Sequence, residues 1–306
     1  MTRSLAIIAA LTCCLLTGSG GKPKRLRILG IGSVTINVKN PDAAENFYSK
    51  QLQFRPDRHT TCEAVPHNCL AVAIGQRLDI VSPSSPAEGQ YLGEIAFETT
   101  DVRALREKLN NSGIKTSEIM KAPGDRNHHS LLSFTVVDPE NHRLKFVEYE
   151  GCIVCEGDSD NPISGHIIHA GFVVHDREAE DKFYKDILGF HVYWHGGMKE
   201  GEDNWVDMQV PDGTDWIEYM LKVPENASHK TLGVMNHIAL GVPDIHKAQE
   251  QLVKNGWKGG EEPKIGRDGK WQLNLYDPDE TRVELMEFTP TKEPCCSPYT
   301  GPHPHP

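Results

Sequence analysis

Positive charge is scarce in this chain of 306 residues. Lys and Arg together number 32, against 43 Asp and Glu, so the formal net charge is -11. Because no basic stripe offsets this acidity, nucleic acid is not an expected partner. The hydrophobic fraction of 38% is ordinary for a globular protein. The length allows roughly two domains with a buried core, and the excess acid is most simply explained by solubility.

A long apolar run is also missing. The run Leu5–Leu16 is shorter than the roughly 20 residues that a membrane-spanning helix needs. A basic residue precedes it and small residues follow, an order typical of a secretory signal peptide. We therefore expect residues 1–21 to be cleaved, leaving a secreted or periplasmic protein without stable membrane insertion. Two alternatives stay open: a lipid anchor at Cys13 or Cys14, and an uncleaved anchor because the basic residues of 22–27 hinder cleavage.

Export would make the remaining six cysteines disulfide candidates. They are Cys62, Cys69, Cys152, Cys155, Cys295 and Cys296. The even count fits pairing, but six cysteines allow 15 connectivities. We expect Cys62 and Cys69 to close a local loop. We also expect the cysteines near residue 152 to meet those near residue 295 and to tie two halves of the chain together.

One pattern occurs four times after Ile28. A short apolar strand leads to a helix start, an amphipathic helix and further strands that end in an alternating run. The four copies open near Ser33, Gly93, His169 and His237. In the second and fourth copies an aspartate suited to N-capping precedes matching apolar helical positions, which are Val102, Leu105 and Leu109 after Asp101, and Ile245, Ala248 and Leu252 after Asp244.

This internal repeat determines the fold prediction. A unit of one strand, one helix and three strands cannot bury its sheet face alone, whereas two units side by side can. The predicted fold class is α+β, with four βαβββ modules paired into two curved mixed-sheet half-barrels and helices outside. We expect an N-terminal module pair over 28–150, a linker over 151–165, a C-terminal pair over 166–290 and a disordered, proline-containing tail over 291–306.

Four residues of the C-terminal pair have the chemistry of metal ligands. Strand alternation places His169 and His237 on the concave face beside small residues, and places Glu218 and Glu284 inward from the closing strands. Two imidazoles and two carboxylates suit one divalent ion such as Zn, Ni, Fe or Mn. Four ligands on an octahedral ion leave two positions for substrate oxygens. The alternative interpretation is that the histidines are core residues and the glutamates are surface charges.

Two sequence patterns resemble a known family. The run Phe183-Tyr184…Leu188-Gly189-Phe190 and the run Asp277-Pro278-Asp279…Val283-Glu284-Leu285 resemble recurring signatures of the vicinal oxygen chelate superfamily. This superfamily includes glyoxalase I, bleomycin-resistance proteins, extradiol dioxygenases and methylmalonyl-CoA epimerase. The resemblance covers about residues 28–290. It implies metal ligands on the two opening and two closing strands of one module pair, at His169, Glu218, His237 and Glu284.

The N-terminal pair departs from that pattern. Ser33, Asp79, Glu94 and Lys145 stand where the four candidate ligands stand in the C-terminal pair. A lysine at a ligand position replaces the charge of a metal with its own. We therefore expect the metal site to be lost in residues 28–150, with Lys145 paired to Asp79 or Glu94. The alternative is that Lys145 extends into solvent.

Three functions compete. The first is a metal-dependent lyase or isomerase of glyoxalase I type, acting on a small substrate with vicinal oxygens. The metal would stabilise an enediolate, with Glu218 or Glu284 as general base. The second is an Fe(II) extradiol dioxygenase in which His169, His237 and Glu284 form a facial triad, with His195 as a candidate acid–base residue. The third is a non-catalytic small-molecule binder. The sequence allows either a monomer or a homodimer.

Overall fold

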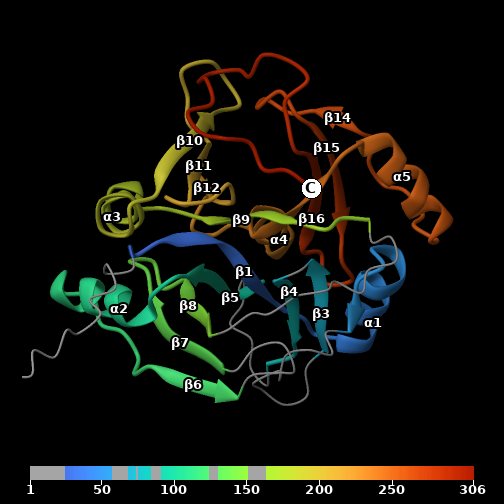
Figure 1. Ribbon diagram of the computed structural model, residues 1–306. Coiled ribbons are helices and arrows are strands. Elements are labelled where there is room, and N and C mark those ends of the chain that lie inside the picture. Colours follow the sequence, from blue (N-terminus) through green and yellow to red (C-terminus); the bar gives the residue numbers. More distant parts are fainter. Residues whose placement is uncertain (1–24, 57–67, 74, 84–90, 124–129, 151–162) are drawn as a thin grey trace, which may run out of the picture.

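A computed structural model describes residues 25–56, 68–73, 75–83, 91–123, 130–150 and 163–306. Within these residues the chain forms two eight-stranded mixed sheets, one from each half of the sequence, with short helices at their flanks (Figure 1). The predicted fold class is confirmed: each half is a pair of βαβββ modules joined into one curved sheet.

The first sheet has the strand order β2-β3-β4-β1-β5-β8-β7-β6. Its strands are β1 (Ile28–Asn37), β2 (Arg55–Pro56), β3 (Asn68–Ala73), β4 (Gln76–Val81), β5 (Leu92–Thr99), β6 (Met120–Pro123), β7 (Ser130–Val137) and β8 (Arg143–Glu150). Its helices are α1 (Pro41–Asn46), continued by the π-helical turn η1 (Phe47–Gln51), and α2 (Val102–Asn111).

The second sheet repeats that arrangement as β10-β11-β12-β9-β13-β16-β15-β14. Its strands are β9 (Ile167–Val173), β10 (His191–Gly196), β11 (Trp205–Gln209), β12 (Trp216–Met220), β13 (His237–Val242), β14 (Lys264–Ile265), β15 (Trp271–Tyr276) and β16 (Arg282–Glu287). Its helices are α3 (Arg177–Asp181), continued by η2 (Lys182–Leu188), α4 (His229–Met235) and α5 (Ile245–Lys254).

The opening strands of the modules join each sheet at its centre. β9 and β13 are antiparallel, with Ala170 opposite Ile238, while each opening strand runs parallel to the closing strand of its own module. β1 and β5 pair in the same antiparallel way. The opening and closing strands of both modules therefore lie side by side at the middle of the concave face.

The helices form where local sequence favours them. The carboxylate of Asp101 accepts the amide N–H of Ala104, and the carboxylate of Asp244 accepts those of His246 and Lys247, so both predicted N-caps are confirmed. The apolar positions predicted for α2 and α5 are buried. These faces cover the convex side of the sheets and leave the concave side for other contacts.

One hydrophobic core extends across both halves. It includes residues of both sheets, and the rings of Phe97 and Phe190 meet edge to face with centroids 5.5 Å apart. The side-chain amide of Gln76 donates to the carbonyls of Ile31 and Ile167, at 2.9 and 3.1 Å, and so bridges the opening strands of the two sheets. The two halves therefore pack as one body.

The C-terminal segment 291–306, here called the strap, was expected to be disordered, and this expectation is wrong. The strap follows β10: Trp194 Nε1 donates to the Cys295 carbonyl at 3.1 Å, and the Thr300 amide donates to the Tyr193 carbonyl at 3.0 Å. Gln209 Nε2 also donates to the Pro302 carbonyl at 2.9 Å. Its prolines prevent the strap from forming a helix or strand, but hydrogen bonds and aromatic contacts with the second sheet hold it in one conformation.

The cysteine predictions are partly overturned. Cys295 and Cys296 form a disulfide with each other, so the expected link from this pair to the cysteines near residue 152 is wrong. The two cysteines are adjacent in the sequence and bond to each other within the strap. Cys69 is disulfide-bonded. Cys62, Cys152 and Cys155 lie outside the described residues, as do the predicted signal peptide and most of the predicted linker.

Within the part of the chain that the structure describes, no helix is both long and apolar enough to cross a bilayer.

Candidate metal centre

The four predicted ligand residues converge from four adjacent strands of the second sheet. His169 lies on β9, Glu218 on β12, His237 on β13 and Glu284 on β16. The register explains the convergence: Glu218 lies opposite Gly171 on β9, and Ala239 on β13 lies opposite both His169 and Glu284. Alternation along each strand then directs all four side chains to one face.

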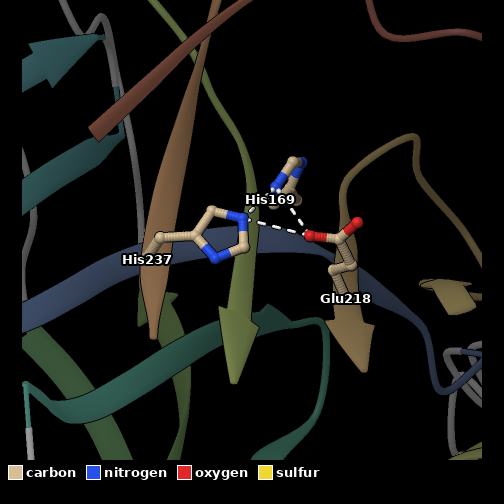
Figure 2. Close-up of side chains that lie close together, drawn as sticks. All are labelled: His169, Glu218 and His237. Atoms are coloured by element: carbon tan, nitrogen blue, oxygen red, sulfur yellow. Dashed lines mark hydrogen bonds and ion pairs between the residues drawn. The ribbon is translucent and has the colours of Figure 1, made fainter. Parts of the chain in front are cut away.

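One oxygen of each carboxylate lies within 4.0 Å of both histidine Nε2 atoms. The Nε2 atoms of His169 and His237 are 3.0 Å apart, and Glu218 Oε2 lies 3.1 Å from His237 Nε2 and 3.7 Å from His169 Nε2 (Figure 2). Glu284 Oε2 lies 3.7 and 4.0 Å from the same two nitrogens. Neighbouring donor atoms around one zinc-sized ion are about 3 Å apart, since each bond is about 2.1 Å long. His169, Glu218 and His237 form a group whose ligand atoms all lie within 4.8 Å of one another, which suits one cation, and Glu284 lies beside this group.

The small residues beside the histidines make room for imidazole. A Cβ atom at Gly171 would lie only 2.1 Å from Cε1 of His237, so a larger residue there would displace the ring. His237 is fully buried and His169 is 1% exposed. The His237 ring therefore occupies the space that the missing side chain of Gly171 leaves open.

Burial controls the protonation of the site. Desolvation raises the pKa of both Glu218 and Glu284 to about 7, and it lowers the pKa of His169 and His237 well below the usual value. The Nδ1–H of His237 donates to the Met235 carbonyl at 3.0 Å, which leaves the Nε2 lone pair directed into the centre. The neutral imidazoles are already in the form that binds metal, whereas the two carboxyls must release their protons when a cation binds.

Arg282 was not identified from the sequence. Its Nη2 donates to His237 Nε2 at 2.6 Å and lies 4.0 Å from Glu218 Oε2 and 3.9 Å from Glu284 Oε2. The guanidinium is thus a cation held by the same atoms that would bind a metal. The contact with the Arg282 guanidinium shows that these nitrogen and oxygen atoms can surround a positive charge. Its position could have been predicted from strand alternation, because Arg282 precedes Glu284 by two residues on one strand and so lies on the same face.

Lys270 is the second residue that sequence reasoning missed. Its Nζ is fully buried, has no hydrogen-bond partner, and lies 4.6 Å from the ring centroid of Trp216 and 5.3 Å from those of Tyr193 and Tyr299. We call these three rings the aromatic cage. Burial lowers the pKa of Lys270 to about 8, while the nearby Asp268 carboxylate opposes this shift. Tyr299 belongs to the strap, so the contact depends on tertiary packing.

The corresponding positions of the first half carry a different arrangement. Asp79 pairs with Arg77 Nε at 2.9 Å, and Glu94 pairs with Arg143 Nε at 2.7 Å. Lys145 is only 8% exposed, so the alternative that it extends into solvent is wrong. Among the described residues, these positions form no group of three potential metal ligands. Arginine cations neutralise the carboxylates that the sequence comparison singled out.

The paired βαβββ modules, with histidines on the opening strands and glutamates on the closing strands, define a protein of the vicinal oxygen chelate type. The chain belongs to the Glyoxalase/Bleomycin resistance protein/Dioxygenase superfamily. The sequence model of this family matches residues 30–146 and 166–285.

One known protein is similar to this chain in sequence. A probable chloroplastic lactoylglutathione lyase from Arabidopsis thaliana is 25% identical over 134 residues, which cover 42% of this chain and 38% of that protein. The match therefore spans well under half the length of this relative.

Solved structures share the fold. The 2,3-dioxygenase LapB from Pseudomonas sp. KL28 has a TM-score of 0.64 at 15% identity, covering 92% of this chain and 95% of its own. A Mn(II)-bound glyoxalase from Novosphingobium aromaticivorans has a TM-score of 0.62 at 18% identity, covering 86% and 83%. Homoprotocatechuate 2,3-dioxygenase from Brevibacterium fuscum, in complex with 3,4-dihydroxyphenylacetate, has a TM-score of 0.62 at 17% identity, covering 85% and 80%.

Proposed function

We propose that this protein is a metal-dependent lyase or isomerase of glyoxalase I type that acts on a small 2-oxo substrate with vicinal oxygens. The observation that carries the proposal is the position of Glu218. Its Oε2 lies as close to His237 Nε2 as the two histidine nitrogens lie to each other. A ligand set of two imidazoles and two carboxylates, His169, Glu218, His237 and Glu284, uses this residue. A triad of two histidines and one glutamate leaves it without a role.

The chemistry follows from the buried carboxyls. A divalent cation held by the four ligands would supply Lewis-acid stabilisation for negative charge on two neighbouring substrate oxygens. Glu218 takes a proton from one substrate carbon and returns it to the adjacent carbon, so the reaction is a net isomerisation. In the metal-free protein burial raises the pKa of Glu218 to about 7, so desolvation makes this carboxylate a stronger base than an exposed glutamate.

Two further groups assist this step. The Arg282 guanidinium and the Lys270 ammonium are buried cations beside the centre. Both compensate negative charge that develops on substrate oxygens, because a low-dielectric site strengthens such attraction. The strap supplies Tyr299 to the aromatic cage and so helps to bury the Lys270 cation.

An extradiol dioxygenase is the second candidate, and the solved ring-cleaving enzymes of the same fold favour it. It would use His169, His237 and Glu284 as the facial triad. The acid–base histidine considered for this reaction does not support it. The His195 side chain is 40% exposed, and its Nδ1 is paired with Asp203 Oδ1 at 2.7 Å.

Substitution of Glu218 separates these functions. Protein loaded with Mn(II), Ni(II), Zn(II) or Fe(II) is assayed on a hemithioacetal of a 2-oxoaldehyde and, separately, for oxygen uptake on catechols. We expect turnover of the hemithioacetal, and a loss of roughly 100- to 10,000-fold in Glu218→Gln, as for removal of a general base. Asp79→Asn, at the corresponding position of the first half, is the matched control and should retain full activity.

Three outcomes would contradict the proposal. Full activity in Glu218→Gln removes the lyase mechanism. Oxygen uptake on catechols with bound Fe(II) establishes the dioxygenase instead. A protein that binds neither metal nor these substrates under any loading condition is better described as a small-molecule binder, as bleomycin-resistance proteins are.

A further inference from the structure

A second cluster of potential metal ligands lies where the two halves of the chain meet. Asp138 and His142 belong to the loop between β7 and β8 of the first half, and Glu180 lies in α3 of the second half. One potential ligand atom from each residue lies within 4.8 Å of the other two. Asp138 is 4% exposed and Glu180 is fully buried. The cluster is separate from the centre formed by His169 and His237.

The repeated fold provides an internal comparison for this loop. In the first half, Asp138 Oδ1 accepts the amide N–H groups of Glu140 at 3.1 Å and His142 at 2.8 Å. In the second half, Asp277 Oδ1 accepts those of Asp279 and Thr281, each at 2.9 Å. The two loops therefore have the same hydrogen-bonded turn, built around one aspartate.

The contact of each loop with the opposite half is also duplicated. Tyr184 of the second half donates its hydroxyl to Asp138 Oδ2 at 3.0 Å, and Tyr48 of the first half donates to Asp277 Oδ2 at 3.2 Å. The turn and the contact between halves thus need only an aspartate and a tyrosine.

Two residues distinguish the loops. His142 stands where the other loop has Thr281, because each is the fourth residue after its aspartate. Glu180 stands where the other half has Ala44, because each is the fourth residue after its helix N-cap. An imidazole and a carboxyl have therefore been added to a turn that forms without them.

One oxygen of the added carboxyl lacks a hydrogen-bond partner. Glu180 Oε1 accepts the Glu140 amide at 3.0 Å, but Oε2 is buried and has no hydrogen-bond partner. The Nδ1–H of the added imidazole, His142, donates to Asp138 Oδ2 at 2.7 Å. A buried carboxylate oxygen without a partner is costly, and a second carboxylate beside it increases the cost. A cation between these groups would satisfy both.

We propose that Asp138, His142 and Glu180 bind a divalent ion of the zinc class at the boundary between the two halves. One imidazole and two carboxylates are suitable ligands for such an ion. The ion would replace the proton between His142 and Asp138, and their 2.7 Å separation would widen to about 3.3 Å, as expected for bonds of about 2.1 Å. Because the ligands come from both halves, the ion fastens the β7–β8 loop to α3.

A proton is the competing occupant. Burial and the adjacent Asp138 carboxylate raise the pKa of Glu180 to about 9, so a neutral carboxyl also relieves the charge. In that case the cluster binds no metal, and the experiment below distinguishes the two occupants.

The test uses the double variant His142→Thr/Glu180→Ala, which introduces the residues of the corresponding turn and should therefore fold. Full-length protein is stripped with a chelator and titrated with Zn(II) by calorimetry. Zinc content is measured after dialysis against a weak chelator. We expect two tightly held equivalents in the native protein and one in the double variant. The matched variant His169→Ala/His237→Ala should also retain one, with a melting temperature that still rises on zinc addition.

Glu180→Gln is the second, more conservative variant and should weaken zinc binding at this site at least tenfold. Three results would overturn the proposal. The first is unchanged zinc content in His142→Thr/Glu180→Ala. The second is complete loss of zinc in His169→Ala/His237→Ala. The third is a native zinc affinity in Glu180→Gln, which would assign a proton to the cluster.

Discussion

At the residue scale, charge is balanced differently at the same position of the two halves. In the first half, Arg143 pairs with Glu94 at 2.7 Å. In the second half, Arg282 contacts the nitrogen of His237 at 2.6 Å and remains within 4.0 Å of Glu218. Replacement of a carboxylate by an imidazole removes the strong partner of this arginine. The second centre can therefore exchange its guanidinium for a metal ion, while the first is already neutralised.

This balance predicts an unusual pH dependence for metal-free protein. Burial raises the pKa of Glu218 and Glu284 from 4.5 to about 7, so the folded state holds these protons more tightly than the unfolded state does. The resulting stability is present below pH 4.5 and is lost as the pH rises through 7. The buried histidines act in the opposite sense, because burial lowers the pKa of His169 and His237, and the stability they contribute is lost as the pH falls below about 6.5. The variant Glu218→Gln keeps both histidines and therefore isolates the carboxyl. In chelated protein, the free energy of unfolding of the native chain should fall relative to that of Glu218→Gln between about pH 5 and pH 8, by on the order of 3 kcal/mol.

Thermal scans across this pH range, with and without Mn(II), provide the measurement. Saturating metal should reverse the fall, because it replaces the protons on both carboxylates. Glu218→Gln should retain only part of the pH dependence. A stability difference between native protein and Glu218→Gln that is flat or grows in favour of the native protein from pH 5 to pH 8 would contradict the assigned pKa shift of Glu218.

At the element scale, the two halves are connected by matching hydrogen bonds from η1 and η2. Tyr184→Phe removes the hydroxyl that donates to the buried Asp138 carboxylate. We expect a loss of roughly 1.5–3 kcal/mol in urea-induced unfolding, as for hydrogen bonds to charged groups. Tyr219→Phe is the matched control, because the Tyr219 hydroxyl is buried without a partner and its removal should be neutral or stabilising. Equal losses in the two variants would show that the Asp138 contact has no special value.

The strap is the second element with a testable role. Residues 291–306 cover Trp194 and contribute Tyr299 to the aromatic cage. Truncation after residue 290 should leave both sheets folded but expose Trp194 and Lys270. We expect a red shift of tryptophan fluorescence, faster hydrogen exchange in β10 and a lower melting temperature. Tyr299→Phe, which removes only the hydroxyl bonded to Asp268, should change these properties much less. An unchanged fluorescence spectrum on truncation would show that the strap does not cover the site.

At the scale of the whole molecule, the continuous core predicts cooperative unfolding. Phe97 of the first half packs on Phe190 of the second, and Gln76 bridges both opening strands. We expect one calorimetric transition, with equal calorimetric and van't Hoff enthalpies. Phe97→Ala should keep a single transition but lower the free energy of unfolding by roughly 3–5 kcal/mol. Two resolved transitions, of which Phe97→Ala shifts only one, would show that the halves unfold independently.

We also propose that residues 1–21 direct export and are then removed. The support is the sequence order of a basic residue, a short apolar run and small residues. N-terminal sequencing of protein recovered outside the cytoplasm should begin near residue 22. Recovery of the full chain in the cytoplasm would contradict this proposal.

Local features of the sequence determined the strands, the helix caps and the convergence of His169, Glu218, His237 and Glu284. Alternation along a strand and capping at a helix start depend on neighbouring residues, and the repeat transferred this information from one module to the next. Arg282 could also have been predicted, because it shares a strand face with Glu284.

Only the tertiary structure decided which distant surfaces meet. It placed the strap over Lys270 and brought Glu180 of one half to His142 of the other. These contacts join segments that are far apart in the chain or that lack any periodic pattern, so no local rule specifies them. Their positions follow from packing the two sheets on one shared core.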